Sequence, residues 1–231
     1  NAALRAGLSV RNYGFSDASV YEAGAPGDVP PVRDPASEKR VIYTPAAAAL
    51  APYSDPYFRG FDMRLADYWR VLEWQREFAQ QEAANAMPAL TLLRLSHDHF
   101  GDFDKAIDGV NTVETQMADN DYAIGMVVES VAKSRFKDST LIFMIEDDAQ
   151  NGTDHVDARR SIANAVGPYV RQQALVSTRY TTVSMLRTIE AVLGLEPLGL
   201  NDAMALPMAD VFDLNQKSWS YRASAADVLR T

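Results

Sequence analysis

The 231-residue chain contains no cysteine, which excludes disulfides, thiolate nucleophiles and cysteine-ligated zinc or iron–sulfur sites together. Long apolar runs are also missing. Stretches such as Ala46–Pro52 and Thr140–Ile145 are far shorter than the roughly 20 residues that span a bilayer. We therefore predict no integral membrane segment.

The chain has fewer positively than negatively charged residues. Lys and Arg number 22 against 31 Asp and Glu, which gives a formal net charge of −9. This balance argues against a nucleic acid partner or an anionic membrane surface. A phosphate-bearing ligand would need a local positive centre such as a metal ion.

Several common catalytic motifs are absent as well. The chain has no G-x-S-x-G elbow, no G-x-x-x-x-G-K-[ST] loop and no G-x-G-x-x-G fingerprint. A calcium loop starting at Asp147 fails because Ala149 and Ala158 occupy positions that need oxygen ligands. Serine-hydrolase, P-loop, Rossmann and EF-hand interpretations therefore have no sequence support.

What the sequence does contain is an alternation of helical and strand-like patterns. The predicted strands are 8–15, 41–43, 87–95, 140–145 and 162–166, and the predicted helices are 62–85, 115–134 and 182–193. Residues 15–60 are rich in Pro, Gly and Asp and are predicted to form a long surface excursion. The pattern is typical of an α/β fold with a mostly parallel sheet that helices cover on both faces. The length favours a single domain over residues 1–231.

The three histidines all lie next to an aspartate, shortly after a predicted strand. His97-Asp98-His99 follows one strand, and Asp154-His155 comes soon after Glu146-Asp147-Asp148 at the end of another. Either cluster alone is typical of a solvated turn. Together, at the strand ends where α/β proteins bind ligands, so many carboxylates would repel one another unless a cation neutralised them. We therefore predict a divalent metal site.

The residue types leave the metal open. Imidazole with carboxylate suits zinc, manganese or iron, whereas carboxylates alone suit magnesium or calcium. Asp119 and Asn120 are predicted at the start of the helix that follows the first cluster, where both residue types favour the N-cap. A direct catalytic role for them stays open beside the cap.

Three blocks of sequence, together with Arg5–Gly14, resemble one enzyme family. The blocks are Met117–Gly125, Ile145–Asp157 and Ser177–Glu190. They are similar to the bacterial phosphoesterases of the alkaline phosphatase superfamily, in the branch that includes phospholipase C and a related acid phosphatase. The likeness covers residues 1 to about 213, and its most specific part is the Glu-Asp-Asp…Asp-His-Val pattern within the second block.

This resemblance implies roles for five residues. Asp147 and Asp148 would bind the catalytic metal, and Asp98 and His99 match the family's Asn-Asp-His block. His155 would bind a second metal or contact the phosphoryl group, and His99 and His155 would act as catalytic proton donors. His97 stands where the family usually has Asn, so no role is predicted for it. The implied protein is an alkaline phosphatase-like, metal-dependent hydrolase of phosphate mono- or diesters, periplasmic or secreted.

The family's Glu-Asn metal motif and its Thr or Ser nucleophile are not found in these residues. We therefore expect the chain to be the C-terminal portion of a phosphoesterase, inactive alone, whose partner is an N-terminal portion that carries the first strands and the nucleophile. A non-catalytic structural or binding fragment that keeps part of the metal site is the alternative. A sulfatase or phosphonate hydrolase also stays open, because the superfamily shares its metal core.

Overall fold

The computed structural model describes residues 2–16, 20–22, 41–106, 108–147, 149 and 160–230. The chain divides into two compact units. Unit 1 consists of Asn1–Gly7 and Val131–Tyr221, and unit 2 consists of Leu8–Ser130 and Arg222–Thr231. A single domain over residues 1–231 stays a prediction.

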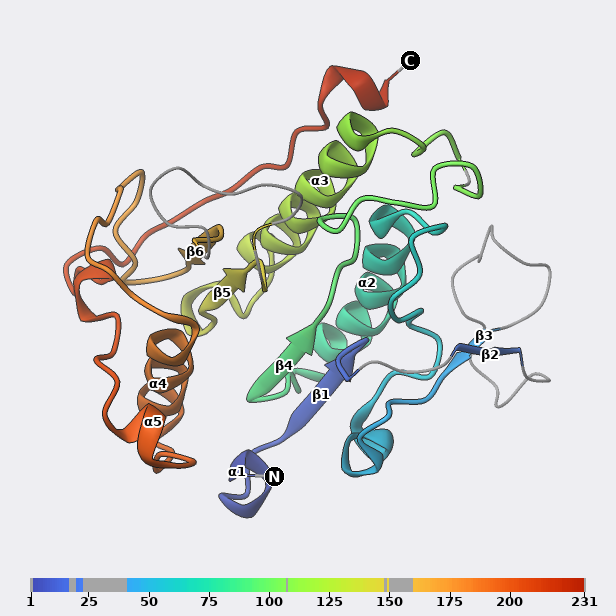
Figure 1. Ribbon diagram of the computed structural model, residues 1–231. Helices are drawn as coiled ribbons and strands as arrows, with labels where there is room; N and C mark the ends of the chain where they lie inside the picture. Colours follow the sequence, from blue (N-terminus) through green and yellow to red (C-terminus); the bar gives the residue numbers. More distant parts are fainter. Residues whose placement is uncertain are drawn as a thin grey trace. The chain divides into compact units, whose positions relative to one another are not determined.

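Unit 2 contains a short parallel strand pair. Strand β1 (Val10–Tyr13) runs parallel to β4 (Leu90–Leu93), and Figure 1 shows the two side by side. Asn12 also forms a parallel bridge with Ser54, which follows the 3₁₀ helix η1 (Ala48–Tyr53). Strands β2 (Val20–Glu22) and β3 (Val41–Tyr43) form a separate antiparallel pair. The carboxyl ends of β1 and β4 therefore lie at the same edge of their sheet.

Unit 2 also contains the long helix α2 and most of the long helix α3. Helix α2 spans Asp67–Ala84 and ends at Asn85, whose left-handed backbone (φ 51°) caps the last turn. Helix α3 spans Val113–Lys133, and its residues from Val131 onward belong to unit 1. The 3₁₀ helix η4 (Asp227–Leu229) completes unit 2. Buried aromatic side chains form much of the core, including Trp74 and Phe78, whose rings stack at 4.7 Å.

Unit 1 contains a small antiparallel pair of strands and several helices. Its elements are α1 (Ala2–Arg5), η2 (Lys137–Ser139), β5 (Ile142–Ile145), β6 (Ala163–Val166), α4 (Thr182–Leu193), α5 (Leu200–Ala203) and η3 (Ala209–Val211). Strands β5 and β6 pair antiparallel, and α5 packs beside α4 (Figure 1). The core of this unit centres on Met185, Met208 and Val211, with Phe143 and Ile189 packed against them.

The mixed α/β class is confirmed, but the strand pairing differs from the prediction. Among the described residues, β1 with β4 is the one parallel pair, and the other two pairs are antiparallel. The apolar run that predicted a fully buried strand forms β5, whose side chains are half-buried with Ile145 exposed. Short apolar runs do not distinguish a parallel strand from an antiparallel one, which explains the difference.

The element boundaries moved by a few residues. Helix α2 begins at Asp67 rather than at the predicted 62, because Asp62 accepts a turn hydrogen bond from the Leu65 amide and lies in a loop before the helix. Within the predicted excursion over 15–60, residues 17–19 and 23–40 lie outside the described residues, and the rest includes β2, β3 and η1. None of the helices that the structure describes has the length and hydropathy needed to cross a membrane.

Candidate functional site

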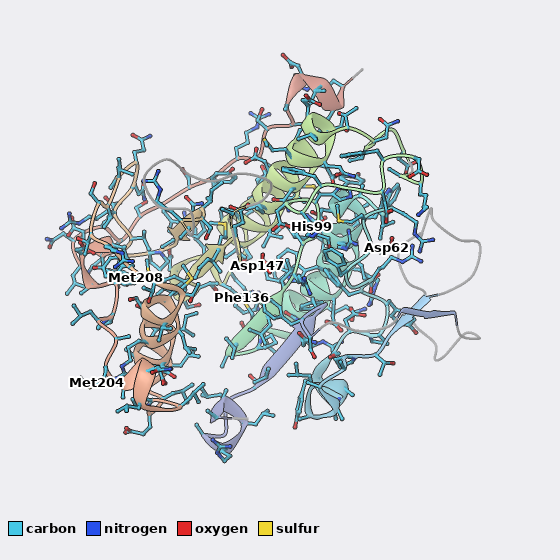
Figure 2. All side chains as sticks on the ribbon, in the orientation of Figure 1. Asp62, His99, Phe136, Asp147, Met204 and Met208 are labelled. Carbon is cyan, nitrogen blue, oxygen red and sulfur yellow. The ribbon has the colours of Figure 1, made fainter. Side chains whose placement is uncertain are left out.

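The first predicted ligand pair lies in a turn directly after β4. The amide of His99 donates to the carbonyl of Ser96 at 3.1 Å, which closes the turn. Asp98 is half-buried and His99 is exposed. The His99 ring meets Phe61 edge-on, with the ring centroids 5.3 Å apart. Both predicted ligands therefore lie just beyond the carboxyl end of β4, within unit 2; Figure 2 labels His99.

The second predicted group follows β5 in unit 1. Glu146 is hydrogen-bonded to Ile162, the residue just before β6. The Glu146 amide donates to the Ile162 carbonyl at 3.0 Å, and its carboxylate accepts from the Ile162 amide at 3.3 Å. Asp147, labelled in Figure 2, comes next and is exposed. Asp148 and His155 lie outside the described residues. The structure thus describes one predicted ligand of this group, Asp147, within its own unit.

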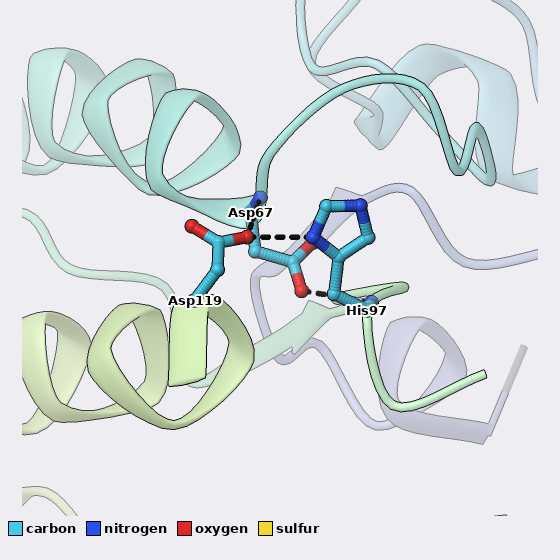
Figure 3. Close-up of side chains that lie close together, drawn as sticks. All are labelled: Asp67, His97 and Asp119. Carbon is cyan, nitrogen blue, oxygen red and sulfur yellow. Dashed lines mark hydrogen bonds and ion pairs between the residues drawn. The ribbon is translucent and has the colours of Figure 1, made fainter. Parts of the chain in front are cut away.

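One group of buried carboxylate and imidazole side chains among the described residues was not predicted from the sequence. Figure 3 shows Asp67 at the start of α2, His97 in the turn after β4 and Asp119 in the first half of α3. All three are buried, with at most 3% of the residue exposed. Nδ1 of His97 lies 2.7 Å from Oδ2 of Asp119. This Asp67–His97–Asp119 group joins two helices to the end of a strand.

Asp67 holds the turn that follows β4. Its carboxylate accepts hydrogen bonds from the amides of Ser96, at 3.0 Å, and His97, at 2.9 Å. It also pairs with Arg70 at 2.9 Å, and both side chains are fully buried. The Asn120 side chain donates to the same carboxylate at 3.0 Å. The backbone that carries Asp98 and His99 is therefore anchored to the first turn of α2.

Asp119 caps α2 from a neighbouring helix. Its carboxylate accepts from the amides of Asp67, at 2.6 Å, and Tyr68, at 3.2 Å. These amides are among the unpaired donors at a helix start, and Ala66 at the N-cap makes no side-chain bond to them. The negative charge also complements the positive end of the helix dipole.

The prediction that Asp119 and Asn120 begin a helix is therefore wrong, although Asp119 does cap the start of a different helix, α2. Helix α3 starts earlier, at Val113, where Thr112 and Thr115 exchange backbone-to-hydroxyl hydrogen bonds. Asp119 and Asn120 consequently lie inside α3 and serve the start of α2 instead.

The hydrogen bonds of His97 favour its charged form. Nδ1 faces the Asp119 carboxylate and Nε2 faces the Met63 carbonyl at 3.0 Å, so each ring nitrogen has an acceptor. Both nitrogens can donate at once only in the imidazolium form. Burial alone would lower the pKa of His97, but the bond to Asp119 and the nearby Asp67 charge raise it above its ordinary value.

Asp67, His97 and Asp119 could hold a metal ion, since one ligand atom of each lies within 4.8 Å of the others. Two carboxylates and one imidazole do not select a particular ion. In the structure, protein groups already occupy these ligand atoms: the carboxylates accept from backbone amides and the Arg70 guanidinium, and Nδ1 of His97 faces the Asp119 carboxylate. A cation here would have to break these interactions.

Sequence reasoning found the Asp98–His99 turn but assigned no role to His97 and did not consider Asp67. Asp67 and Asp119 are 52 residues apart, and nothing in the local pattern of either indicates that they meet. A signal was available for His97, since a histidine next to a buried strand end is often fixed by a carboxylate.

No model of a known protein family matches the chain, and a search of curated proteins finds no match.

Proposed function

We propose that this chain is part of a metal-dependent phosphoesterase that hydrolyses phosphate mono- or diesters. The observation that carries this proposal is the placement of Asp98–His99 directly after β4 and of Asp147 directly after β5. Ligands of α/β proteins commonly bind beyond the carboxyl ends of parallel strands, and β4, which precedes Asp98–His99, is such a strand. The exposure of His99 and Asp147 supports the same function, because an ion and a substrate can reach these side chains from solvent.

In this function Asp147 and Asp148 would bind the catalytic metal, and Asp98, His99 and His155 would complete a second metal site or act as proton donors. His99 and His155 would donate protons to the leaving oxygen. The bound divalent ion would supply charge stabilisation to the phosphoryl oxygens and lower the pKa of the attacking hydroxyl. The metal is zinc, manganese, iron, magnesium or calcium.

The sequence resemblance assigns the nucleophile, a Thr or Ser, to a segment upstream of the one that matches Arg5–Gly14, together with the first strands of an alkaline phosphatase-like sheet. The working enzyme then needs both portions. The same resemblance supports a periplasmic or secreted location.

Hydrolysis of p-nitrophenyl phosphate and bis-p-nitrophenyl phosphate by the full-length parent protein, assayed with each divalent metal, tests this function. We expect turnover that a chelator abolishes and metal restores. Asp147→Asn is expected to lower it at least about tenfold, the typical effect of disturbing a metal's ligand shell. The exposed Asp138, also in unit 1, offers a matched control, and Asp138→Asn should leave the rate unchanged.

Metal-independent turnover, or equal turnover in Asp147→Asn and Asp138→Asn, would contradict the proposed function. Metal binding without turnover of either ester would favour the alternative, a non-catalytic fragment that retains part of the metal site.

A further inference from the structure

Phe61 is an exposed aromatic side chain that contacts both a guanidinium and an imidazole. It is 38% exposed. The guanidinium carbon of Arg94 lies 5.0 Å from the centre of its ring, and the His99 ring meets it at 5.3 Å with an interplanar angle of 85°. A single exposed aromatic needs no explanation, but one in contact with both a guanidinium and an imidazole has the composition of a ligand site.

The backbone that carries Phe61 is held in place from inside unit 2. The fully buried Arg70 donates from one nitrogen, Nη2, to the carbonyls of Gly60, at 2.9 Å, and Asp62, at 2.7 Å, on either side of Phe61. Its Nε donates to the carbonyl of Arg59 at 3.0 Å. Phe61 therefore presents its ring to solvent from a fixed loop, so little conformational entropy is lost when a ligand binds.

The backbone segments that carry Arg94 and His99 are also held by hydrogen bonds. The Arg94 amide donates to the Tyr13 carbonyl at 2.9 Å, which sets Arg94 at the carboxyl ends of β1 and β4. The turn that carries His99 is anchored by Asp67, the partner of Arg70. One buried ion pair, Arg70 with Asp67, thus holds both the Phe61 loop and the His99 turn.

We propose that Phe61, Arg94 and His99 form a subsite for the alcohol portion of the substrate, and that the substrate class is phosphate esters of aromatic or apolar alcohols. This inference rests on the proposed phosphoesterase function. The Arg94 guanidinium attracts the phosphoryl anion from one side of the Phe61 ring. The alcohol that leaves beside His99 then packs on the exposed part of the ring.

The chemistry of the subsite separates two kinds of ester. An aromatic alcohol gains both apolar contact and ring stacking with Phe61. A polar alcohol such as glycerol carries the same phosphate charge but has no apolar surface to bury. The preference for the first kind over the second therefore reports on Phe61, whereas binding of inorganic phosphate reports on the metal and on Arg94.

Calorimetric binding to the full chain, loaded with manganese, tests the subsite with phenyl phosphate, glycerol 3-phosphate and inorganic phosphate as probes. We expect phenyl phosphate to bind about fivefold tighter than glycerol 3-phosphate, the size of one aromatic contact. Phe61→Ala should remove this preference and leave inorganic phosphate binding unchanged. Phe103 is a matched control, because it is 40% exposed in the same unit, and Phe103→Ala should keep the preference.

The outcomes separate the subsite from the proposed function. If inorganic phosphate binds but the wild-type chain shows no preference for phenyl phosphate, or if Phe61→Ala keeps that preference, the subsite is overturned and the phosphoesterase function stands. If the chain binds none of the five candidate metals and no inorganic phosphate, the proposed function is overturned, and the subsite with it.

Discussion

Among the carboxylates that the structure describes in unit 2, Asp55 has the most clearly shifted pKa. It is fully buried, accepts from the Tyr57 amide at 2.7 Å and lies 3.5 Å from the Arg76 guanidinium. Burial and the nearby carboxylates of Glu73 and Glu77 raise the pKa of Asp55 to about 7. The folded chain therefore binds a proton here that the unfolded chain, with an ordinary aspartate pKa, releases at lower pH.

This difference predicts a pH dependence of stability. Because the pKa of Asp55 is raised in the folded state, its contribution to stability is fully present below the unfolded pKa near 4 and is lost as the pH rises through about 7. We expect Asp55→Asn to remove most of this decline and to exceed wild-type stability above pH 7 by roughly a few kcal/mol. Urea unfolding from pH 4 to pH 8 measures it.

The exposed Asp104 supplies the control, and Asp104→Asn should follow the wild-type curve. A decline of unchanged size in Asp55→Asn would show that other groups cause it. The raised pKa of His97 acts in the same direction, since the stability from its bond to Asp119 is lost as the pH rises through the folded pKa.

At the scale of elements, α2 depends on a cap that comes from α3. Asp119→Asn keeps the shape of the side chain but removes the charge that faces His97 and the start of α2. Breaking a buried pair by removing one charge typically costs about 3 kcal/mol. We expect that loss in the free energy of unfolding, measured by urea titration followed by circular dichroism.

Asp121 lies on the same helix two residues away and is exposed, so Asp121→Asn should cost less than about 0.5 kcal/mol. Equal stabilities of the two variants would mean that the Asp119 contacts contribute nothing to the fold.

Gly167, next to the end of β6, is required by space as well as by backbone conformation. Its φ is 143°, and a Cβ there would lie 2.6 Å from the Thr140 carbonyl oxygen and 3.0 Å from the Leu141 side chain. We expect Gly167→Ala to destabilise unit 1 by about 2 kcal/mol or more, because backbone must shift. Thermal unfolding would show this, with Gly101→Ala as the control, since nothing lies within 4 Å of a Cβ there. A Gly167→Ala variant as stable as Gly101→Ala would refute the steric argument.

The elements also show where sequence reasoning succeeds. Helix α4 was predicted with both ends correct, because Thr181 forms a capping box with Ser184 and Gly194 adopts the left-handed C-cap, both local signals. The Asp67–His97–Asp119 group could not be predicted in this way, since it joins residues that meet only in the folded chain. For the same reason the Asp98–His99 turn was found from its sequence, while the anchor that holds it, Asp67, was not.

At the scale of the molecule, unit 1 exposes aliphatic side chains around α5. Leu200, Met204 and Leu206 are each more than 75% exposed, and Leu198 is 60% exposed. Apolar surface gathered in one segment favours association. We expect the double variant Leu200→Gln, Met204→Gln to self-associate less than the wild-type chain in sedimentation velocity runs at equal concentration. Leu175→Gln, at a 93% exposed position in another loop, should have a smaller effect; an equal effect would contradict a role for the α5 segment.

The central claim concerns the metal ligands predicted from the sequence, which include Asp98 and His99 in unit 2 and Asp147 in unit 1. Manganese affinity, measured by calorimetry on the wild-type chain and on the Asp98→Asn and Asp147→Asn variants, tests this claim most directly. We predict that each variant weakens manganese binding at least about tenfold, the typical effect of disturbing a metal's ligand shell. Wild-type affinity in both variants would contradict the proposed metal ligands.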